Sequence, residues 1–532
     1  MKKPNILFIT TDQQRRDTLG CCGNSLIKTP NIDRLAAEGV QFDRAYCQSP
    51  ICIPGRITMI TGKTAQHHGA TLHNTSMRTN EKTIGHVLAE NGYATHFIGK
   101  AHFSSQQHAG NPEQILGWRN GLYKGWNGPY AGFETTELIL GHSNSLLSHY
   151  GQWLEEKFPQ HYKKFIFEEM KPIDVTCGQG TYKNKIPEEA YSSTYVGERT
   201  CEYIKKAAAG DKPFYCFASF PDPHWPIYPP EPWFSMYDNL TDEQLSPWIT
   251  PYAGEKERSD YPPNYKVPLE KRRGTPPYDG GGHFMPNPAD AFKITRPYWG
   301  SVSLIDKNIG KIMSALDECG ITENTIVVFT TDHGDYMGAH GWMAKGGFVW
   351  EEFIHIPYIV RWPGTYKPAR TGAYISLIDA VPTLLESVGL PLNSLASDGV
   401  SQHGVLTGAS SSARDSVLVT HFASSPDLCW PDIHVIIKDD FKLIYYAGAG
   451  KGELYNLARD PRELDNLYEK PDCEKTRNAL TLELLDRLIL ERDKQPMLDR
   501  RNDDGYNEHA MIYKTWEPEF KRYEELMNSK NR

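Results

Sequence analysis

The sequence predicts an α/β fold built on a large, doubly wound and mostly parallel sheet that is flanked by helices. Four apolar runs rich in β-forming residues each break off into polar side chains: Asn5–Gln14, Tyr93–His102, Phe214–His224 and Thr325–Asp335. The first and last of these runs nearly repeat each other around Thr-Thr-Asp. Continuous apolar runs are typical of strands buried on both faces of a parallel sheet. Helical patterns alternate with the runs, as they do in doubly wound proteins.

The helical patterns have recognisable ends. Residues 29–42 offer Thr29 or Asn31 as the cap and Gly39 as the stop. Residues 83–93 and 303–320 each close on a glycine that suits the first position beyond a helix. These patterns supply the helices that the predicted sheet requires.

The composition changes twice along the chain. Prolines and glycines between about residues 225 and 288 exclude long regular elements and predict surface loops, which often set specificity. The Gly-, Trp- and Tyr-rich residues 117–133 suit either such a loop or plain packing. Short strands with tight turns follow residue 410, and a charged helical segment begins near Cys473. We therefore predict a main domain at residues 1–410 and a smaller α+β domain, with a short antiparallel sheet and a helical tail, at residues 411–532.

Composition and charge limit the classes of partner. The chain has 532 residues, of which 39% are hydrophobic and 23% charged, so it reads as an ordinary soluble globular protein. Its formal charge of −9 gives no support to nucleic acid or an anionic membrane as a partner. An anionic substrate would therefore require positive charge concentrated at one place.

The amino terminus reads as a buried strand. Only four consecutive apolar residues, Ile6–Ile9, follow the first lysines, whereas a signal peptide needs about 7–15. No run approaches the roughly 20 residues of a membrane span, and the ten cysteines form no CxxC pair. We expect a cytoplasmic protein, although a trimmed signal would leave the same sequence.

The four predicted strands end in side chains that suit a ligand site. In open α/β sheets, ligands bind beyond the carboxyl ends of the strands. Neighbouring strands would therefore gather the following residues at one edge of the sheet: Asp12, Gln13, Lys100, His102, His224, Asp332 and His333.

A further candidate lies at the start of a helix. Pro54 suits the first turn, so Cys52 would lie at or just before the helix N-terminus. Free amides and the positive end of the helix dipole lower a thiol pKa there and favour anions. Arg56 lies one turn further along and can reach back toward Cys52. A cysteine phosphatase separates its cysteine and arginine by five residues rather than three, so the spacing argues against that enzyme.

Residues 52–63, CIPGRITMITGK, resemble the sulfatase signature C-x-P-x-R followed by T-G. Further motifs agree with that family in type and order: TTDQQ, GKAH, PDPHWP, TTDHGDYMGAHGWMAKGG and GELYNLARDPRELDNLY. One such motif alone is weak, but the ordered set spans most of the chain. The chain therefore resembles a type I sulfatase of the alkaline-phosphatase-like superfamily, which implies an alkaline-phosphatase-like sheet.

The resemblance implies that a formylglycine-generating enzyme converts Cys52 to an aldehyde. The hydrated aldehyde has two hydroxyls, of which one attacks sulfur and the other later expels sulfate and restores the aldehyde. An unmodified thiol could not complete this cycle. The implied substrate is a small-molecule or oligosaccharide sulfate ester, such as a sulfated sugar or an aryl or alkyl sulfate.

The resemblance also implies one divalent cation. Its ligands would be Asp12, Gln13, Cys52, Asp332 and His333. Calcium is usual in the family and prefers oxygen ligands, whereas imidazole suits manganese or zinc better. We place calcium first and manganese second.

The remaining site residues receive their roles from the same resemblance. Arg56 would hold the ionised diol, and Lys100 and Lys345 would neutralise sulfate oxygens. His102 would deprotonate the diol during sulfate release, and His224 would be the general acid beside the ester oxygen.

Other assignments stay open. His340 suits loop packing or a substrate contact equally, and Asp335 suits a turn or a supporting position rather than ligation. A phosphonate monoester or phosphodiester hydrolase could use the same scaffold, although Lys100 and His102 favour a sulfatase; a non-catalytic binder of sulfated ligands is the third alternative. A cytoplasmic protein would favour mono- or disaccharide sulfates over polymers. Residues 507–532 could pack across a homo-oligomer interface or form a surface helix.

Overall fold

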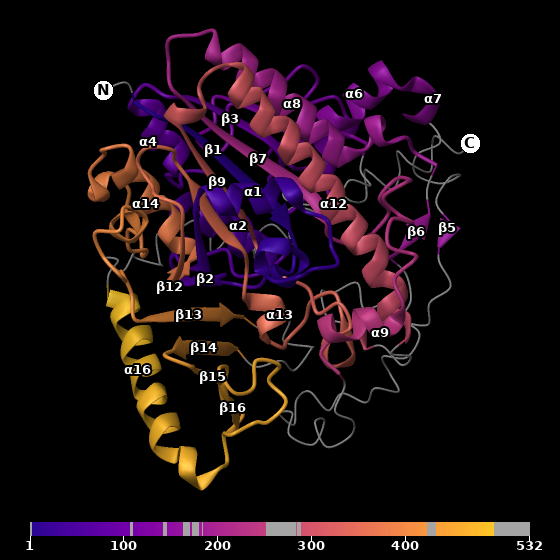
Figure 1. The fold of residues 1–532 in the computed structure, drawn as a ribbon. Helices are drawn as coiled ribbons and strands as arrows, with labels where there is room; N and C mark the ends of the chain where they lie inside the picture. Colours follow the sequence, from indigo (N-terminus) through magenta and orange to yellow (C-terminus); the bar gives the residue numbers. More distant parts are fainter. Residues whose placement is uncertain are drawn as a thin grey trace, which may run out of the picture. The chain divides into compact units, whose positions relative to one another are not determined.

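The structure is a computed structural model that describes residues 3–106, 110–141, 146–162, 171–172, 180–183, 185–251, 283–284, 289–422 and 432–493. Its largest sheet has the strand order β12-β2-β11-β9-β1-β7-β3-β4 (Figure 1). In chain order these strands are β1 (Asn5–Asp12), β2 (Val40–Tyr46), β3 (Ala94–Lys100), β4 (Thr135–Ile139), β7 (Phe214–Pro223), β9 (Thr325–Thr331), β11 (Tyr358–Arg361) and β12 (Ala369–Ser376). Within this sheet only β11 runs antiparallel to its neighbours. The predicted doubly wound, mostly parallel α/β fold is confirmed.

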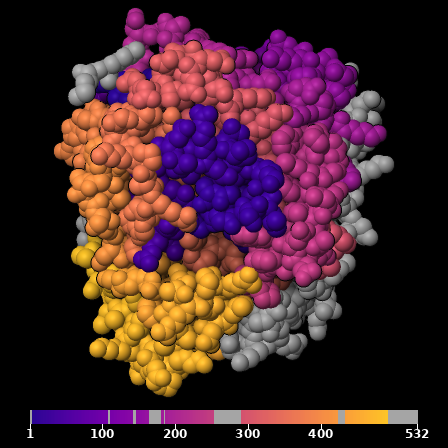
Figure 2. All heavy atoms as spheres, in the orientation of Figure 1, coloured from indigo at the N-terminus to yellow at the C-terminus, as the bar shows by residue number. Residues whose placement is uncertain are grey.

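The four strands predicted from the apolar runs are neighbours at the centre of the sheet, in the order β9-β1-β7-β3. Along β1, Ile6 and Phe8 belong to one hydrophobic cluster, and Leu7 and Ile9 to another. Since alternate side chains of a strand point to opposite faces, both faces of the sheet are covered. Figure 2 shows the indigo N-terminal residues at the centre of one side of the molecule, between orange and magenta segments.

Helices pack on both faces of the sheet. Leu7 and Ile9 share their cluster with residues of α1 (Pro30–Glu38), α8 (Ser192–Ala208) and α12 (Ala289–Glu318). The opposite cluster contains residues of α2 (Cys52–Thr61), α4 (Ile84–Glu90) and α14 (Ala380–Ser387). Shorter elements are α3 (Ala65–His68), α5 (Ile115–Arg119), α6 (His149–Lys157), α7 (Pro159–Tyr162), α9 (Asp242–Leu245), α13 (Glu351–Ile354), α15 (His403–Leu406), β5 (Lys171–Pro172), β6 (Tyr182–Lys183), β8 (His283–Phe284) and β10 (Trp342–Met343).

The predicted helix ends are found, but one cap comes from a distant residue. Helix α1 follows Thr29 and stops at Gly39. Its free amides at Asn31 and Ile32 donate to the Asp306 carboxylate at 3.0 and 2.8 Å. Asp306 is 275 residues away from Asn31 and lies on α12, so this carboxylate ties two helices together as well as capping one.

The described part of residues 225–288 holds only short elements, as predicted: α9, a single 3-10 turn at Ser246–Trp248, and β8. Strand β8 pairs with β10. In the part of the chain that the structure describes, no helix combines the length and the apolar character needed to cross a membrane.

The predicted small sheet is also confirmed. Strands β13 (Ser416–His421), β14 (Ile433–Lys438), β15 (Phe441–Tyr446) and β16 (Gly452–Asn456) form an antiparallel sheet in chain order. Helix α16 (Glu474–Asp493) follows. Residues 1–481 form one compact unit that contains both sheets, and residues 482–532 form another. The boundary at residue 410 stays a prediction, and residues 507–532 lie outside the described residues.

A buried ionic network joins the small sheet to the main one. Lys442 on β15 pairs with Glu351 Oε1 at 3.2 Å and with Glu463 Oε1 at 2.7 Å. Glu351 is the first residue of α13, and Phe353 of that helix accepts a hydrogen bond from Gly334 N at 2.8 Å. The network therefore holds α13 in place beside the residues that follow β9.

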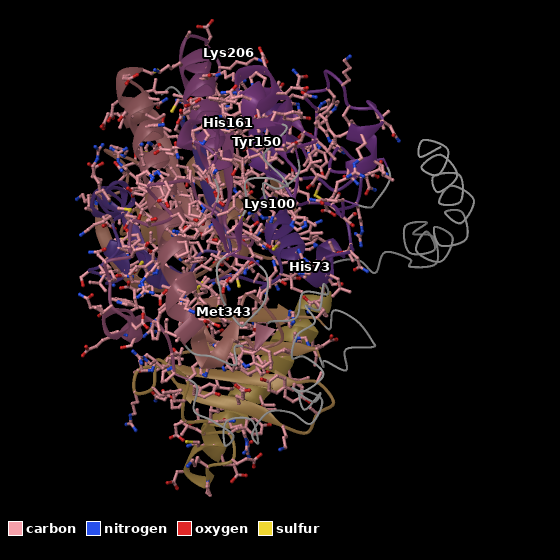
Figure 3. All side chains as sticks on the ribbon, turned by 90° about the vertical axis from the view of Figure 1, so that its right-hand side faces the viewer. His73, Lys100, Tyr150, His161, Lys206 and Met343 are labelled. Atoms are coloured by element: carbon pink, nitrogen blue, oxygen red, sulfur yellow. The ribbon has the colours of Figure 1, made fainter. Side chains whose placement is uncertain are left out.

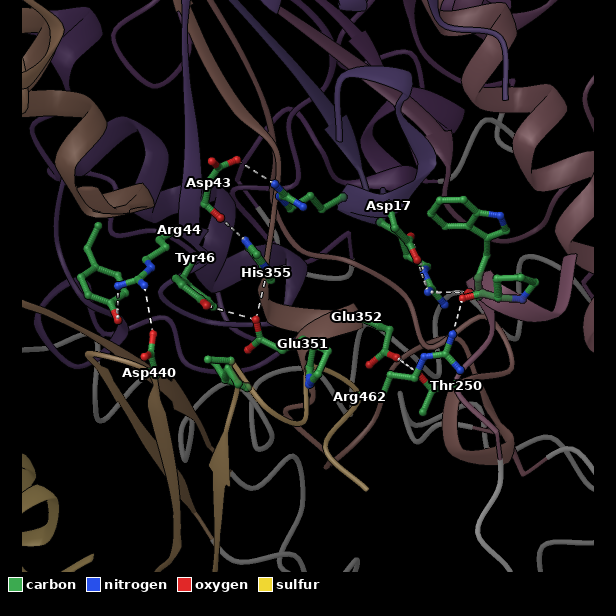
Figure 4. Close-up of a pocket in the computed structure, with 18 of the residues that line it drawn as sticks. Asp17, Asp43, Arg44, Tyr46, Thr250, Glu351, Glu352, His355, Asp440 and Arg462 are labelled. Carbon is green, nitrogen blue, oxygen red and sulfur yellow. Dashed lines mark hydrogen bonds and ion pairs between the residues drawn. The ribbon is translucent and has the colours of Figure 1, made fainter. Parts of the chain in front are cut away.

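A pocket of about 550 Å³ opens next to this network (Figure 4). Charged side chains from both sheets line it, and they pair with one another across it. Arg16 binds Asp43 at 3.1 Å, and Arg44 binds Asp440 at 3.1 Å. The first ion pair connects the turn after β1 to β2, and the second connects β2 to the β14–β15 turn.

We expect Lys442→Met to destabilise the fold by about 3–5 kcal/mol, because it leaves two buried carboxylates without their cation. Lys205→Met serves as the control, since Lys205 pairs with Glu318 on the exposed surface and should change stability little. Urea unfolding of both variants tests this. Equal losses in the two variants would contradict the role assigned to Lys442.

Candidate active site

The strand ends converge as the sequence predicts. Asp12 ends β1, Asp332 and His333 follow β9, and Cys52 begins α2. One ligand atom from each of these four buried residues lies within 4.8 Å of the other three. Lys100, the last residue of β3, contacts Asp12 Oδ2 on β1 across the intervening strand β7.

Arg56 holds the two carboxylates in place. Its Nε donates to Asp332 Oδ2 at 2.9 Å, and Nη2 donates to Asp12 Oδ2 at 3.1 Å. The other N–H groups reach the carbonyl of Lys100, the hydroxyl of Ser219 and, at 3.5 Å, the carbonyl of Thr11.

All five N–H groups of the Arg56 guanidinium are therefore engaged, which is the full donor capacity of the side chain. None of these acceptors belongs to Cys52, which carries a thiol in the structure, so the contact of Arg56 with an ionised diol stays a prediction. Arg56 orients the carboxylates of Asp12 and Asp332 and connects them to β3 and β7.

Lys345 contacts both Cys52 and His224. Its Nζ lies 2.6 Å from Cys52 Sγ and 3.0 Å from His224 Nε2, and the lysine is half-buried rather than a surface residue. His224 Nδ1 faces the carbonyl of Trp225. A carbonyl only accepts, so Nδ1 carries the proton and Nε2 accepts from Lys345.

These contacts shift the acidities of the site. Burial alone would raise the pKa of the Cys52 thiol, but the charges of Lys345, His333 and Lys100 outweigh it and lower that pKa. Burial drives the pKa of His224 well below its ordinary value, and Lys345 adds to this shift. His224 is therefore neutral beside a charged lysine.

Two further features fit a bound cation. His333 Nδ1 is 2.8 Å from the carbonyl of Gly334, which fixes the proton on Nδ1 and leaves Nε2 as a ligand atom facing Cys52. Gln13 Oε1 is buried and has no hydrogen-bond partner, while Nε2 of the same amide donates to Asp335 Oδ2 at 2.6 Å. The structure thus offers carboxylate and amide oxygens with one imidazole, a set suited to calcium or manganese.

Asp335 and His340, whose assignments the sequence left open, differ in their contacts. Asp335 orients Gln13 and also accepts from the Trp225 indole at 2.8 Å, which agrees with its predicted supporting position. His340 stacks on Trp350 with ring centroids 3.9 Å apart, so the structure favours its packing alternative.

His102 follows β3 and lies near a histidine that the sequence did not single out. Its ring centroid is 6.4 Å from that of His73, which comes from the loop after α3. Burial lowers the pKa of His73, and the charges of Lys345, His333 and Lys100 lower it further. In Figure 3 the labels of Lys100 and His73 lie between those of Tyr150 and Met343. His73 stands in no motif or periodic pattern, so nothing in the sequence marks it.

Comparison with known proteins identifies the family: the chain belongs to the sulfatases. The Sulfatase family profile matches residues 4–390, and the profile for the C-terminal region of N-sulphoglucosamine sulphohydrolase matches residues 338–489. The chain is a hydrolase of this family, and its relatives support hydrolysis of sulfate esters.

Two curated relatives illustrate the similarity. An arylsulfatase of Clostridium perfringens is 28% identical, over 89% of this chain and 92% of the relative. An N-acetylglucosamine-6-O-sulfatase of Bacteroides thetaiotaomicron is 26% identical, over 90% of this chain and 85% of the relative.

Solved structures share the fold. One is a protein in complex with its substrate D-glucosamine-2-N,6-O-disulfate, with a TM-score of 0.66, 22% identity, and coverage of 94% of this chain and 100% of that one. Another is the phosphonate monoester hydrolase of Agrobacterium radiobacter, with a TM-score of 0.72, 24% identity, and coverage of 92% and 96%. The alkaline-phosphatase-like fold is thereby confirmed.

Metal removal tests the cation site directly. Calcium or manganese added to chelator-treated protein should raise its free energy of unfolding. The gain should be about 2.7 kcal/mol when the concentration of free ion is a hundred times the Kd of the site. His333→Ala and Gln13→Leu should reduce this gain, whereas Asp317→Asn, at an exposed acid on α12, should keep it. The same gain in all four proteins would exclude this cluster as the binding site.

Proposed function

We propose that this sulfatase hydrolyses the sulfate monoester of a sugar, using formylglycine made from Cys52 and one divalent cation. The observation that carries the proposal is the position of Lys345, whose Nζ contacts both Cys52 and His224 beside the carboxylate cluster. Lys345 and Lys100 together supply two positive charges beside residue 52, which suits the three non-bridging oxygens of a sulfate ester.

The sugar is proposed from the relatives. Besides the N-acetylglucosamine-6-O-sulfatase, they include an ulvan-active sulfatase of Formosa agariphila and the human iduronate 2-sulfatase. An arylsulfatase is among them as well, so aryl sulfates are suitable test substrates.

The cation would be held by Asp12, Gln13, Asp332, His333 and residue 52, and we place calcium before manganese. When bound, it would supply positive charge to the sulfate oxygens and lower the pKa of a hydroxyl on residue 52. Arg56 keeps Asp12 and Asp332 in place for this ion.

Residue 52 is a cysteine in the structure, and its Sγ stands in for a hydroxyl oxygen of the hydrated aldehyde. The hydrated aldehyde would supply one hydroxyl to attack sulfur and a second from which sulfate can be expelled. Lys345 lies where it would neutralise charge on the transferred sulfate, as does Lys100 beside Asp12.

The leaving oxygen needs a proton, and Lys345 and His224 share one. At rest the proton is on Lys345, since His224 Nε2 accepts from it. Movement of this proton through His224 would release the sugar hydroxyl as a neutral alcohol. His102 would take the proton of the second hydroxyl when sulfate leaves.

We expect His224→Ala to slow hydrolysis of a sugar sulfate by about 10²–10⁴-fold, the usual worth of general acid catalysis. The loss should be much smaller with 4-nitrophenyl sulfate, because nitrophenolate departs without a proton. His161→Ala, on α7, is the control and should leave both substrates unaffected. Equal losses of His224→Ala on both substrates would exclude it as the acid.

Maturation and substrate class are tested together. Coexpression with a formylglycine-generating enzyme should reduce the mass of the peptide carrying residue 52 by about 18 Da, the change from thiol to aldehyde. The matured protein should then release sulfate from sugar sulfates. Persistent thiol would rule out the proposed nucleophile.

A phosphonate monoester hydrolase is the second candidate, because such an enzyme is among the solved structures with the same fold. Lys100 and His102 favour the sulfatase. Faster turnover of phosphonate monoesters than of any sulfate ester by the matured protein would reverse this choice.

A further inference from the structure

We propose that Glu113 is a positioning residue for sulfate release, because it fixes the backbone that presents His102 to residue 52. This inference rests on the proposed function. It also assigns a role to the Trp- and Tyr-rich residues 117–133, whose side chains hydrogen-bond to Glu113 and to the two residues before it.

Glu113 binds three consecutive amides directly after β3. Its Oε2 accepts from His102 N at 2.6 Å, and its Oε1 accepts from Phe103 N at 2.8 Å and from Ser104 N at 3.0 Å. Tyr130 OH adds a fourth donor to Oε1 at 2.7 Å. The Glu113 side chain is thus a buried carboxylate, 3% exposed, whose four partners are all donors.

His102 needs such support. Its φ of 52° lies in the left-handed region, which non-glycine residues disfavour. Phe103 and Ser104 are buried, so without Glu113 their amides would lose their partner away from water. A single carboxylate therefore stabilises both the unusual backbone angle and the turn that follows it.

Glu113 is itself held from several sides. Its own N–H donates to Asn111 Oδ1 at 2.8 Å, and Tyr123 OH donates to the Asn111 carbonyl at 2.7 Å. Trp118 Nε1 binds the carbonyl of Pro112 at 2.7 Å. Tyr123, Trp118 and Tyr130 all come from the Trp- and Tyr-rich segment, which therefore helps to fix the carboxylate.

The turn also carries His73 with it. Met77 N donates to the carbonyl of Phe103 at 2.8 Å, so the loop that holds His73 is attached to the turn that Glu113 fixes. The rings of His73 and His102 lie on the same side of the site. Loss of Glu113 would therefore displace both histidines while leaving Lys100, inside β3, in place.

The consequence falls on one half of the reaction. In the first half, the oxygen of an already ionised hydroxyl of residue 52 bonds to sulfur. The bond from sulfur to the sugar oxygen breaks with its electron pair passing to that oxygen, which takes the proton that Lys345 supplies through His224. In the second half, His102 takes the proton of the other hydroxyl, a carbonyl forms at residue 52, and the bond to sulfate breaks with its electrons passing to sulfate. Only the second half uses His102, so only that half should slow when the turn is loosened.

The experiment compares Glu113→Gln with Asp306→Asn in the matured full-length protein. Asp306 is the matched control because it too is a buried carboxylate that accepts consecutive amides, at Asn31 and Ile32, but on α1. Hydrogen exchange of residues 102–104 should accelerate in Glu113→Gln only. Its kcat on 4-nitrophenyl sulfate should fall about 10–100-fold while one equivalent of nitrophenol is still released in a burst, and residue 52 should retain sulfate.

Asp306→Asn should lower thermal stability without a burst. If Glu113→Gln does not fold, Asn111→Ala is the second variant, because it removes the oxygen that accepts from Glu113 N. Asn111→Ala should give the same burst with a smaller fall in kcat. Unchanged hydrogen exchange at residues 102–104 of Glu113→Gln would overturn the inference, and so would a fall in its kcat without sulfate retained on residue 52. In either case, turnover of sulfate esters by the wild-type protein would leave the proposed function intact. Matured wild-type protein that hydrolyses no sulfate ester would overturn both.

Discussion

The site depends on one guanidinium that is buried away from the surface. Arg56 is 1% exposed, and its five donors satisfy two carboxylates, two backbone carbonyls and one hydroxyl that come from β1, β3, β7 and the end of β9. Burying Asp12 and Asp332 without such a partner would be expensive, since each carries a charge out of water. The arginine therefore allows an acidic cation site to form in the interior of the sheet, and it sets the spacing of the strands that surround it.

Charge is distributed in two opposed groups around residue 52. Asp12, Asp332 and Nε2 of His333 face it from the ends of β1 and β9, while Lys100 approaches from β3 and Lys345 from a loop. This arrangement supplies the local positive charge that a chain with a formal charge of −9 must concentrate in order to bind an anion. It also explains why Lys345 is half-buried, since its ammonium group lies beside Cys52.

The sequence predicts the part of the molecule that local patterns encode. The four central strands and their polar ends follow from continuous apolar runs, and the place of Cys52 follows from Pro54. Contacts across long sequence separations leave no such pattern. The cap of α1 by Asp306, the partners of Arg56 and the position of His73 depend on which loops meet in space, and the nearby sequence is the same whether or not they meet. The partners of Arg56 show this, because its spacing from Cys52 says nothing about the strands whose carboxylates and carbonyls it binds.

The Lys442 network has a consequence for how the chain could be divided. Lys442 belongs to the small sheet, yet its partner Glu351 begins the helix whose Phe353 carbonyl binds Gly334, directly after His333. A chain shortened before β13 would keep every predicted ligand, but it would bury Glu351 without Lys442, on the helix that binds the residue after His333. The small sheet is therefore not an exchangeable module. Grafting it from a relative would require the lysine and both glutamates to be transferred as a set.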